Sequence, residues 1–152
     1  MDNIFSKMLK LKPNINLNKR SENMPKYGDK TAKVLDNYLK GYKLPTGTTR
    51  SGLFAPIKDL HRNYNTMKTM NLNPSDHFFH CKANYEAASR GRYGAAVATG
   101  AGYLRELADT LIKRDSLSAA RSDLRANARG RAGAAAGKSL RATCPTHHTK
   151  YK

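Results

Sequence analysis

The chain has few acidic residues. Its 152 residues include 11 Asp and Glu against 28 Lys and Arg, so the formal net charge is +17. We find no convincing pair of carboxylates for general acid–base catalysis. The sequence also has no phosphate-binding loop and no nucleophile elbow. We therefore expect a protein that is not an enzyme and that needs no cofactor.

Long apolar runs and cysteines are also scarce. No run of about 18 apolar residues is present, so we expect no transmembrane helix. The start at Met1-Asp2-Asn3 lacks the apolar segment of a secretory signal peptide. The two cysteines, Cys81 and Cys144, are too few for a disulfide framework. They fit a reducing compartment or a single optional bridge between them.

The excess of positive charge predicts adhesion to polyanions such as nucleic acid, anionic lipid or acidic polysaccharide. The alternative is a solvated surface whose charge only keeps the protein soluble.

Residues 75–94 have the start, the periodicity and the end of a helix. Ser75 or Asp76 can cap the first turn, and Gly91 suits the residue that closes a helix with a positive φ. Between them, an apolar face recurs at helical spacing and consists of Phe78, Cys81, Tyr85 and Ala88.

The same stretch reads S-D-x-x-F-H-x-x-x-N-Y-x-A-A-x-R-G-x-x-G, which closely resembles the signature of serum amyloid A proteins. The resemblance covers roughly Asp59 to Gly133. The matching positions that we take as a structural motif are Asp76, Phe79, His80, Asn84, Tyr85, Arg90, Gly91, Asn127, Gly130 and Arg131. The resemblance implies a four-helix bundle, self-association, binding of lipid and retinoid, and affinity for heparin-like polyanions.

Helical patterns elsewhere predict an all-α fold, an antiparallel bundle of about four helices with basic extensions at both ends. We divide the chain into a basic N-terminal extension with one or two short helices (1–52), the serum amyloid A-like bundle (53–133) and a basic flexible tail (134–152). The extension includes a helix after Asp29 with an apolar stripe of Ala32, Leu35 and Leu39.

The other helices of the predicted bundle follow the same reasoning. A helix that begins near Pro56 presents Ile57, Leu60, Tyr64 and Met67 on one face. A helix after Gly94 has a predicted core face made of Val97, Ala101, Leu104, Ala108 and Leu111. Its small residues Gly94, Ala98 and Gly102 allow another helix to approach closely. A last helix, 117–128, turns Leu117, Ala120 and Leu124 inward.

Basic residues at the two ends are the predicted anion-binding groups: Lys7, Lys10, Lys12, Arg129, Arg131, Lys138 and Arg141. The three lysines lie on one side of a possible short amphipathic helix, a candidate anchor on anionic membrane; its alternative is a frayed or packing arm. The tail contacts phosphates without reading sequence, so we expect nucleic-acid binding that is non-specific and salt-sensitive. Its alternatives are a solubilising tail or a tail that wraps the bundle.

A zinc site is a weak possibility. His77 and Cys81 lie one helical turn apart, and Cys144 and His147 offer two further ligands. Isolated histidines and cysteines are usually structural, so we expect no bound metal.

These observations favour a non-enzymatic, self-associating basic protein that binds DNA or a membrane surface. Its composition is similar to that of phage virion proteins that are ejected with the genome and form part of a delivery channel, with other virion proteins as partners. Such a protein belongs in the virion, or in the cytoplasm or periplasmic envelope after delivery. The alternative is a lipid or retinoid carrier, which needs a concave apolar face on the bundle, whereas a channel subunit needs complementary flanks. A secreted effector would need a delivery signal.

Overall fold

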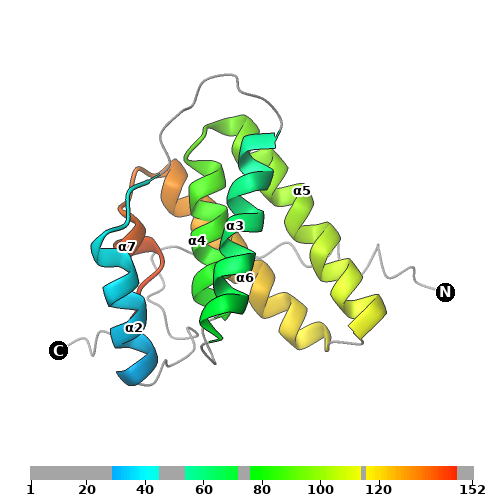
Figure 1. Ribbon diagram of the computed structural model, residues 1–152. Coiled ribbons are helices and arrows are strands. Elements are labelled where there is room, and N and C mark those ends of the chain that lie inside the picture. Colours follow the sequence, from blue (N-terminus) through cyan, green and yellow to red (C-terminus); the bar gives the residue numbers. More distant parts are fainter. Residues whose placement is uncertain (1–28, 45–53, 72–75, 114–115, 147–152) are drawn as a thin grey trace.

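The computed structural model describes residues 29–44, 54–71, 76–113 and 116–146 of the chain (Figure 1). All regular structure in these ranges is helical, which confirms the predicted all-α fold. The elements are α2 (Asp29–Lys40), α3 (Phe54–Met70), α4 (Asp76–Ala88), α5 (Arg92–Ala108), the π-helical turn η1 (Asp109–Lys113), α6 (Leu117–Ala135) and α7 (Leu140–Thr143). Within these same ranges, no helix has the length and apolar character needed to cross a bilayer.

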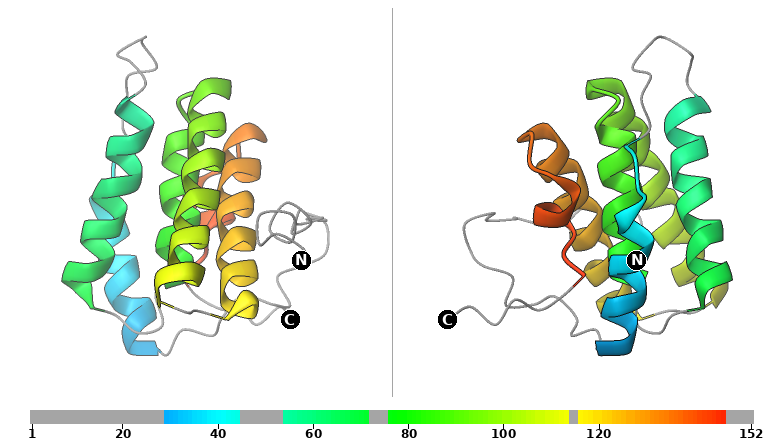
Figure 2. Two further views of the ribbon diagram at one scale, coloured as in Figure 1. Left: turned by 90° about the vertical axis from the view of Figure 1, so that its right-hand side faces the viewer. Right: turned by 60° about the vertical axis from the view of Figure 1, so that its left-hand side comes forward.

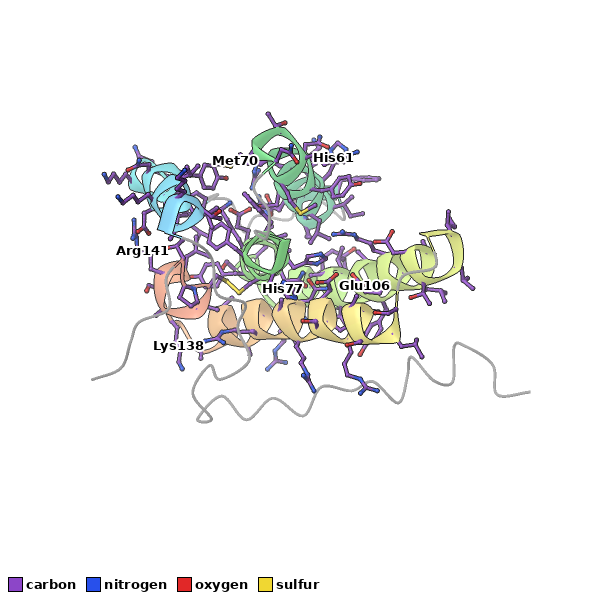
Figure 3. The ribbon with its side chains drawn as sticks, turned by 90° about the horizontal axis from the view of Figure 1, so that it is seen from below. His61, Met70, His77, Glu106, Lys138 and Arg141 are labelled. Carbon is purple, nitrogen blue, oxygen red and sulfur yellow. A yellow bond between two sulfur atoms is a disulfide. The ribbon has the colours of Figure 1, made fainter. Side chains whose placement is uncertain are left out.

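Helix α4 lies at the centre of the bundle. Figure 3 looks along its axis and shows α2, α3, α5, α6 and α7 around it. Every residue from Phe78 to Ala88 is buried. A helix enclosed on all sides cannot turn its polar residues to water, so these residues need partners inside the protein.

The apolar part of the core lies on the side of α4 that faces α2 and α7, which lie beside each other in Figure 1. The predicted stripe of α2 is buried here, and Leu35 is fully enclosed. Phe78 and Phe79 pack edge to face with 5.2 Å between ring centroids. A disulfide joins Cys81 of α4 to Cys144, directly after α7, so the single optional bridge is present.

Helices α3 and α5 turn a different face inward from the one that we predicted as core. Ile57 is 44 % exposed and Leu104 is 66 % exposed. The buried residues of the two helices are small or polar: Pro56, Asp59, Asn63, Gly94, Ala98 and Glu106. On α5 the reason is its close approach to α4, since a Cβ atom on Gly94 would lie 2.0 Å from the carbonyl oxygen of Ala87. On α3 the inward residues Asp59 and Asn63 are partners of polar side chains on α4 and just after it.

A buried ionic network joins α3 to α4. The Glu86 carboxylate contacts the Lys82 ammonium and accepts hydrogen bonds from Arg62 at 2.8 Å and from Asn63 at 2.5 Å. Lys82 also donates to Asn63 at 2.8 Å. Burial lowers the pKa of Arg62, but its hydrogen bond to Glu86 and the charge of that carboxylate outweigh this effect and raise the pKa.

Two further groups extend this network. The hydroxyl of Tyr42 donates to Glu86, and the Lys82 ammonium lies 4.4 Å from the centroid of the Tyr42 ring. Burial, followed by the hydrogen bond to Glu86, raises the pKa of Tyr42. Arg90 donates to Asp59 at 2.5 Å and 3.1 Å, and this hydrogen bonding raises the pKa of Arg90. Lys82, Glu86 and Asp59 are therefore each paired with opposite charge inside the protein.

The C-terminal segment differs from the flexible tail that we predicted. Helix α6 continues past residue 128 to Ala135. Helix α7 packs on the bundle: its first residue, Leu140, is buried, and so is Thr146, which follows the helix. Alanine favours helix, and glycine allows α6 to lie directly against α4. The segment wraps the bundle as far as Thr146, and residues 147–152 lie outside the described ranges.

The contact between α6 and α4 predicts opposite effects for two glycine substitutions. A Cβ atom on Gly130 would lie 2.1 Å from the carbonyl oxygen of Cys81, whereas a Cβ atom on Gly100 meets nothing within 4 Å. We expect Gly130→Ala to lower the free energy of unfolding by about 3 kcal/mol, because backbone atoms cannot move aside as a side chain can. Gly100→Ala should raise it by about 0.5–1 kcal/mol. Urea unfolding measures both, and equal effects would contradict the close contact.

The ionic network predicts a large cost for removing one charge. Glu86→Gln leaves the buried Lys82 ammonium without its carboxylate, so the free energy of unfolding should fall by about 3–5 kcal/mol. Arg141→Ala is the matched control, because it breaks the 3.3 Å pair with Asp36 at the surface and should cost less than about 1 kcal/mol. Denaturant titration of both variants checks the difference, and a small loss in Glu86→Gln would show that the network contributes little.

Candidate functional site

An apolar pocket of about 270 Å³ lies between α3, α4 and α5. Helices α3 and α5 form its two sides, and both panels of Figure 2 show these helices running along the bundle. The apolar walls are formed by Ile57, Leu60, Tyr64, Met67, Phe79, Ala83 and Ala101. The residues predicted as the apolar core face of α3 therefore line this pocket, and the pocket separates them from α5.

Large apolar side chains remain exposed on the same two helices. Phe54 is 65 % exposed on α3, and Leu104 is the most exposed large apolar residue of α5. Leu111 and Ile112 of η1 are exposed as well. Exposed apolar side chains on the helices that form a pocket are typical of a place where a ligand, a membrane or another protein binds.

The floor of the pocket is polar and hydrogen-bonded. Asn84 donates to Asn127 Oδ1 at 2.7 Å and to the carbonyl oxygen of His80 at 3.1 Å, and it accepts from Arg131 at 2.6 Å. His80 Nδ1 lies 3.2 Å from the same Asn127 oxygen. Burial lowers the pKa of His80 to about 3, helped by the nearby charge of Arg105. The imidazole is therefore neutral at physiological pH.

The side chain of Arg105 places a positive charge at the side of the pocket. The guanidinium of Arg105 lies over the ring of Tyr64 at 5.1 Å and pairs with Asp109 at 3.4 Å. Arg105 is thus a charged group at the pocket that can contact the polar end of an amphipathic ligand.

Behind the floor, three side chains from three helices come together. His80 of α4, Glu106 of α5 and Asp123 of α6 each offer one ligand atom, and these atoms lie within 4.8 Å of one another. His77 is adjacent, with Nε2 at 2.6 Å from Ser122 Oγ and 3.6 Å from Asp123. Figure 3 shows the His77 and Glu106 side chains between α4, α5 and α6. We did not predict this cluster, because no short motif connects residues that lie on separate helices.

The motif residues that we took from the family resemblance hold the bundle together. Asp76 begins α4, which ends at Ala88. Gly91, with a φ of +97°, is the N-cap of α5 and not the closing residue of α4 that we predicted. Tyr85 donates from its hydroxyl to the carbonyl oxygen of Lys138 at 2.8 Å, which fixes the segment between α6 and α7. Phe79, His80, Asn84 and Asn127 are buried in or below the pocket floor.

The predicted anion-binding residues divide into three groups. Lys7, Lys10 and Lys12 lie outside the described residues. Three arginines bond within the fold: Arg129 to the carbonyl oxygen of Thr143, Arg131 to Asn84 and Arg141 to Asp36. Burial lowers the pKa of Arg131. Lys138 is exposed. Anion binding by these residues stays a prediction.

The weak zinc candidates are not brought together as a set. Cys81 and Cys144 are joined in the disulfide, so neither sulfur is available as a thiolate ligand. His147 lies outside the described residues. His77 contributes to the cluster beside Asp123 instead.

Comparison with known proteins gives a consistent result. The family model described as "Serum amyloid A protein" matches residues 49–147. Serum amyloid A-3 protein of Oryctolagus cuniculus is 40 % identical over 76 residues, which cover 50 % of this chain and 62 % of that protein. Serum amyloid A-2 protein of Sus scrofa is 39 % identical over 83 residues, 50 % of this chain and 64 % of that protein.

Serum amyloid A protein of Ovis aries is 33 % identical over 74 residues, 46 % of this chain and 66 % of that protein. The chain thus spans slightly less than two thirds of the length of these relatives. The match to the family model, residues 49–147, includes the central α4 with its motif residues and also α3, α5, α6 and α7. The chain belongs to the serum amyloid A family.

Proposed function

We propose that this protein is a non-enzymatic, self-associating binding protein whose pocket between α3 and α5 takes an apolar ligand, such as a lipid acyl chain or a retinoid. The observation that carries the proposal is the outward turn of the apolar faces of α3 and α5. Ile57 lines the pocket, and Leu104 directly precedes Arg105, which also lines it. Both apolar side chains are exposed, although they belong to faces that the sequence pattern marks as core. This surface is the concave apolar face that a carrier needs.

The size and chemistry of the pocket suit this class of ligand. Its volume of about 270 Å³ lies just below the range of about 300–1,000 Å³ that is typical of ligand pockets, which fits one chain or ring system rather than a bulky molecule. Arg105 at its side suits a carboxylate or phosphate at the end of such a ligand. Membership of the serum amyloid A family supports a binding role without catalysis.

Self-association follows from the same surface. Exposed leucine and phenylalanine side chains gain about 1.5–3 kcal/mol each when they are fully buried. A second copy that covers Phe54 and Leu104 would bury them and enclose the pocket further. We therefore propose a homo-oligomer whose subunits meet along α3 and α5.

Two substitutions test the ligand proposal. We expect Ile57→Gln and Leu104→Gln to weaken binding of retinol, or of neutral phosphatidylcholine vesicles, about tenfold each, because each removes more than about 1.4 kcal/mol of apolar contact. The measurement is a fluorescence titration of the full chain. Val34→Gln is the matched control, because Val34 is an exposed apolar residue on α2, away from the pocket. Equal losses in all three variants would rule out this pocket as the site.

Polyanion binding is the second candidate function, and the net charge of +17 supports it. Because the arginines of the C-terminal segment bond within the fold, we propose that lysines provide the contacts: the exposed Lys138, and Lys7, Lys10 and Lys12 of the N-terminal extension. DNA and anionic membrane are the two candidate partners. A role as an ejected phage virion protein rests on composition alone, and the family membership favours the ligand-binding role.

Salt dependence tests this second function. We expect the affinity for duplex DNA to fall steeply between about 50 and 200 mM salt, since each phosphate contact releases counterions. Changing Lys7, Lys10 and Lys12 together to Gln should reduce the slope of log K against log salt by about 3. A triple Gln variant at the exposed Lys33, Lys40 and Lys58 is the control and should keep most of the slope. Fluorescence anisotropy measures it, and binding that does not change with salt would contradict the proposal.

A further inference from the structure

The cluster behind the pocket floor combines the ligand types of a metal site. His80, Glu106 and Asp123 each direct one ligand atom into a space in which these atoms lie within 4.8 Å of one another. His80 and Glu106 are buried, and the side chain of Asp123 is 23 % exposed. The cluster is thus enclosed by three helices and can be reached from solvent beside Asp123.

The hydrogen-bond network fixes the orientation of the amides beside the cluster. An arginine only donates, so the Asn84 atom that lies 2.6 Å from Arg131 is the amide oxygen. The Asn84 nitrogen then points to the opposite side, where it donates to the carbonyl oxygen of His80 and to Asn127. The Asn127 atom that receives this hydrogen bond must therefore be its oxygen.

The same Asn127 oxygen decides the tautomer of His80. It lies 3.2 Å from Nδ1, and an oxygen can only accept, so Nδ1 carries the hydrogen. In this tautomer of the imidazole, Nε2 is the nitrogen that holds a lone pair. That lone pair faces Asp123 Oδ2 at 3.5 Å. The nitrogen lone pair and the carboxylate oxygen could both bind a cation placed between them.

We propose that His80, Glu106 and Asp123 form a binding site for one divalent transition-metal ion of the zinc class. The imidazole nitrogen would bind through Nε2, and each carboxylate through one oxygen. The hydrogen bond from Nδ1 to Asn127 is the arrangement that holds a metal-binding imidazole in place and makes its other nitrogen a better donor.

The ligand set favours zinc over the alkaline-earth ions. Ca²⁺ and Mg²⁺ prefer oxygen ligands only, whereas Zn²⁺ takes imidazole and carboxylate together. Two carboxylates carry the charge that a divalent ion balances. Zinc ligands lie about 2.0–2.2 Å from the ion, so the three side chains move closer together when it binds. Water completes the coordination, because three protein ligands leave the fourth tetrahedral position open.

One positive charge, that of Arg105, lies near the site. Arg105 is close enough to affect His80, and its charge opposes metal binding. Its guanidinium, however, is held toward the pocket side by Asp109 and by the ring of Tyr64. The Asp109 carboxylate partly offsets the charge of Arg105.

Zinc titration of the full-length protein tests the proposal. We expect one Zn²⁺ per chain by calorimetry, and at a hundredfold excess over the dissociation constant an increase in Tm of about 5–10 °C. Mg²⁺ and Ca²⁺ at the same concentration should leave Tm unchanged. Glu106→Gln and Asp123→Asn should each lose at least about tenfold in zinc affinity, since they keep the side-chain shape and remove one anionic ligand.

Two control variants separate this site from other zinc ligands. Asp36→Asn removes a carboxylate on α2 that is as exposed as that of Asp123, at 23 %, but lies outside the cluster, so it should keep the zinc-induced rise in Tm. Changing His147 and His148 together to Gln removes the adjacent histidines near the C-terminus and should also keep it. Loss of zinc binding in this double variant, with normal binding in Glu106→Gln, would overturn the proposal.

A measurement on the unmutated protein avoids any effect of substitution on folding. In ¹⁵N spectra of the histidine rings, we expect zinc to shift the His80 Nε2 resonance while Nδ1 keeps its hydrogen. Absence of zinc binding, or binding without a change at His80 Nε2, would show that the cluster is not a metal site.

Discussion

The structure depends on the complete enclosure of α4. A helix that is surrounded by five others has no solvent-facing side, yet this one carries His80, Lys82, Asn84 and Glu86. Burial of such groups without partners would cost far more than the stability of a small domain. The surrounding helices therefore have to present polar partners at fixed positions. Asn63 and Arg62 do so from α3, and Asn127 and Arg131 do so from α6.

Enclosure also requires small residues on the helices that approach α4. Gly94 and Gly130 stand where a Cβ atom would overlap the α4 backbone. Larger apolar side chains of α5 have no room on this inward face, so Leu104 lies on the outer surface. The exposed apolar surface of α3 and α5 is thus a consequence of the close packing around α4, and it provides the pocket on which the proposed ligand binding depends.

His80 connects the two sites of the protein. It forms part of the pocket floor through its ring, while its Nε2 faces Asp123 on the other side. The hydrogen bonds of Asn84 and Asn127 fix this orientation. A metal ion in the proposed site would tie α4, α5 and α6 together directly behind the pocket, so its presence and the rigidity of the pocket floor are physically coupled.

Much of this protein was determined by its sequence alone. The helical periodicity, the turn near Gly91 between α4 and α5 and the stripe of α2 follow from local patterns, and the family signature is readable without coordinates. The tertiary structure decided which face of α3 and α5 is buried, the disulfide between Cys81 and Cys144, and the meeting of His80, Glu106 and Asp123. An apolar stripe marks a side of a helix, but the partner helix determines whether that side is inside. Here small and polar residues of α3 and α5 face α4, and Ile57 and Leu104 of the apolar stripes are exposed.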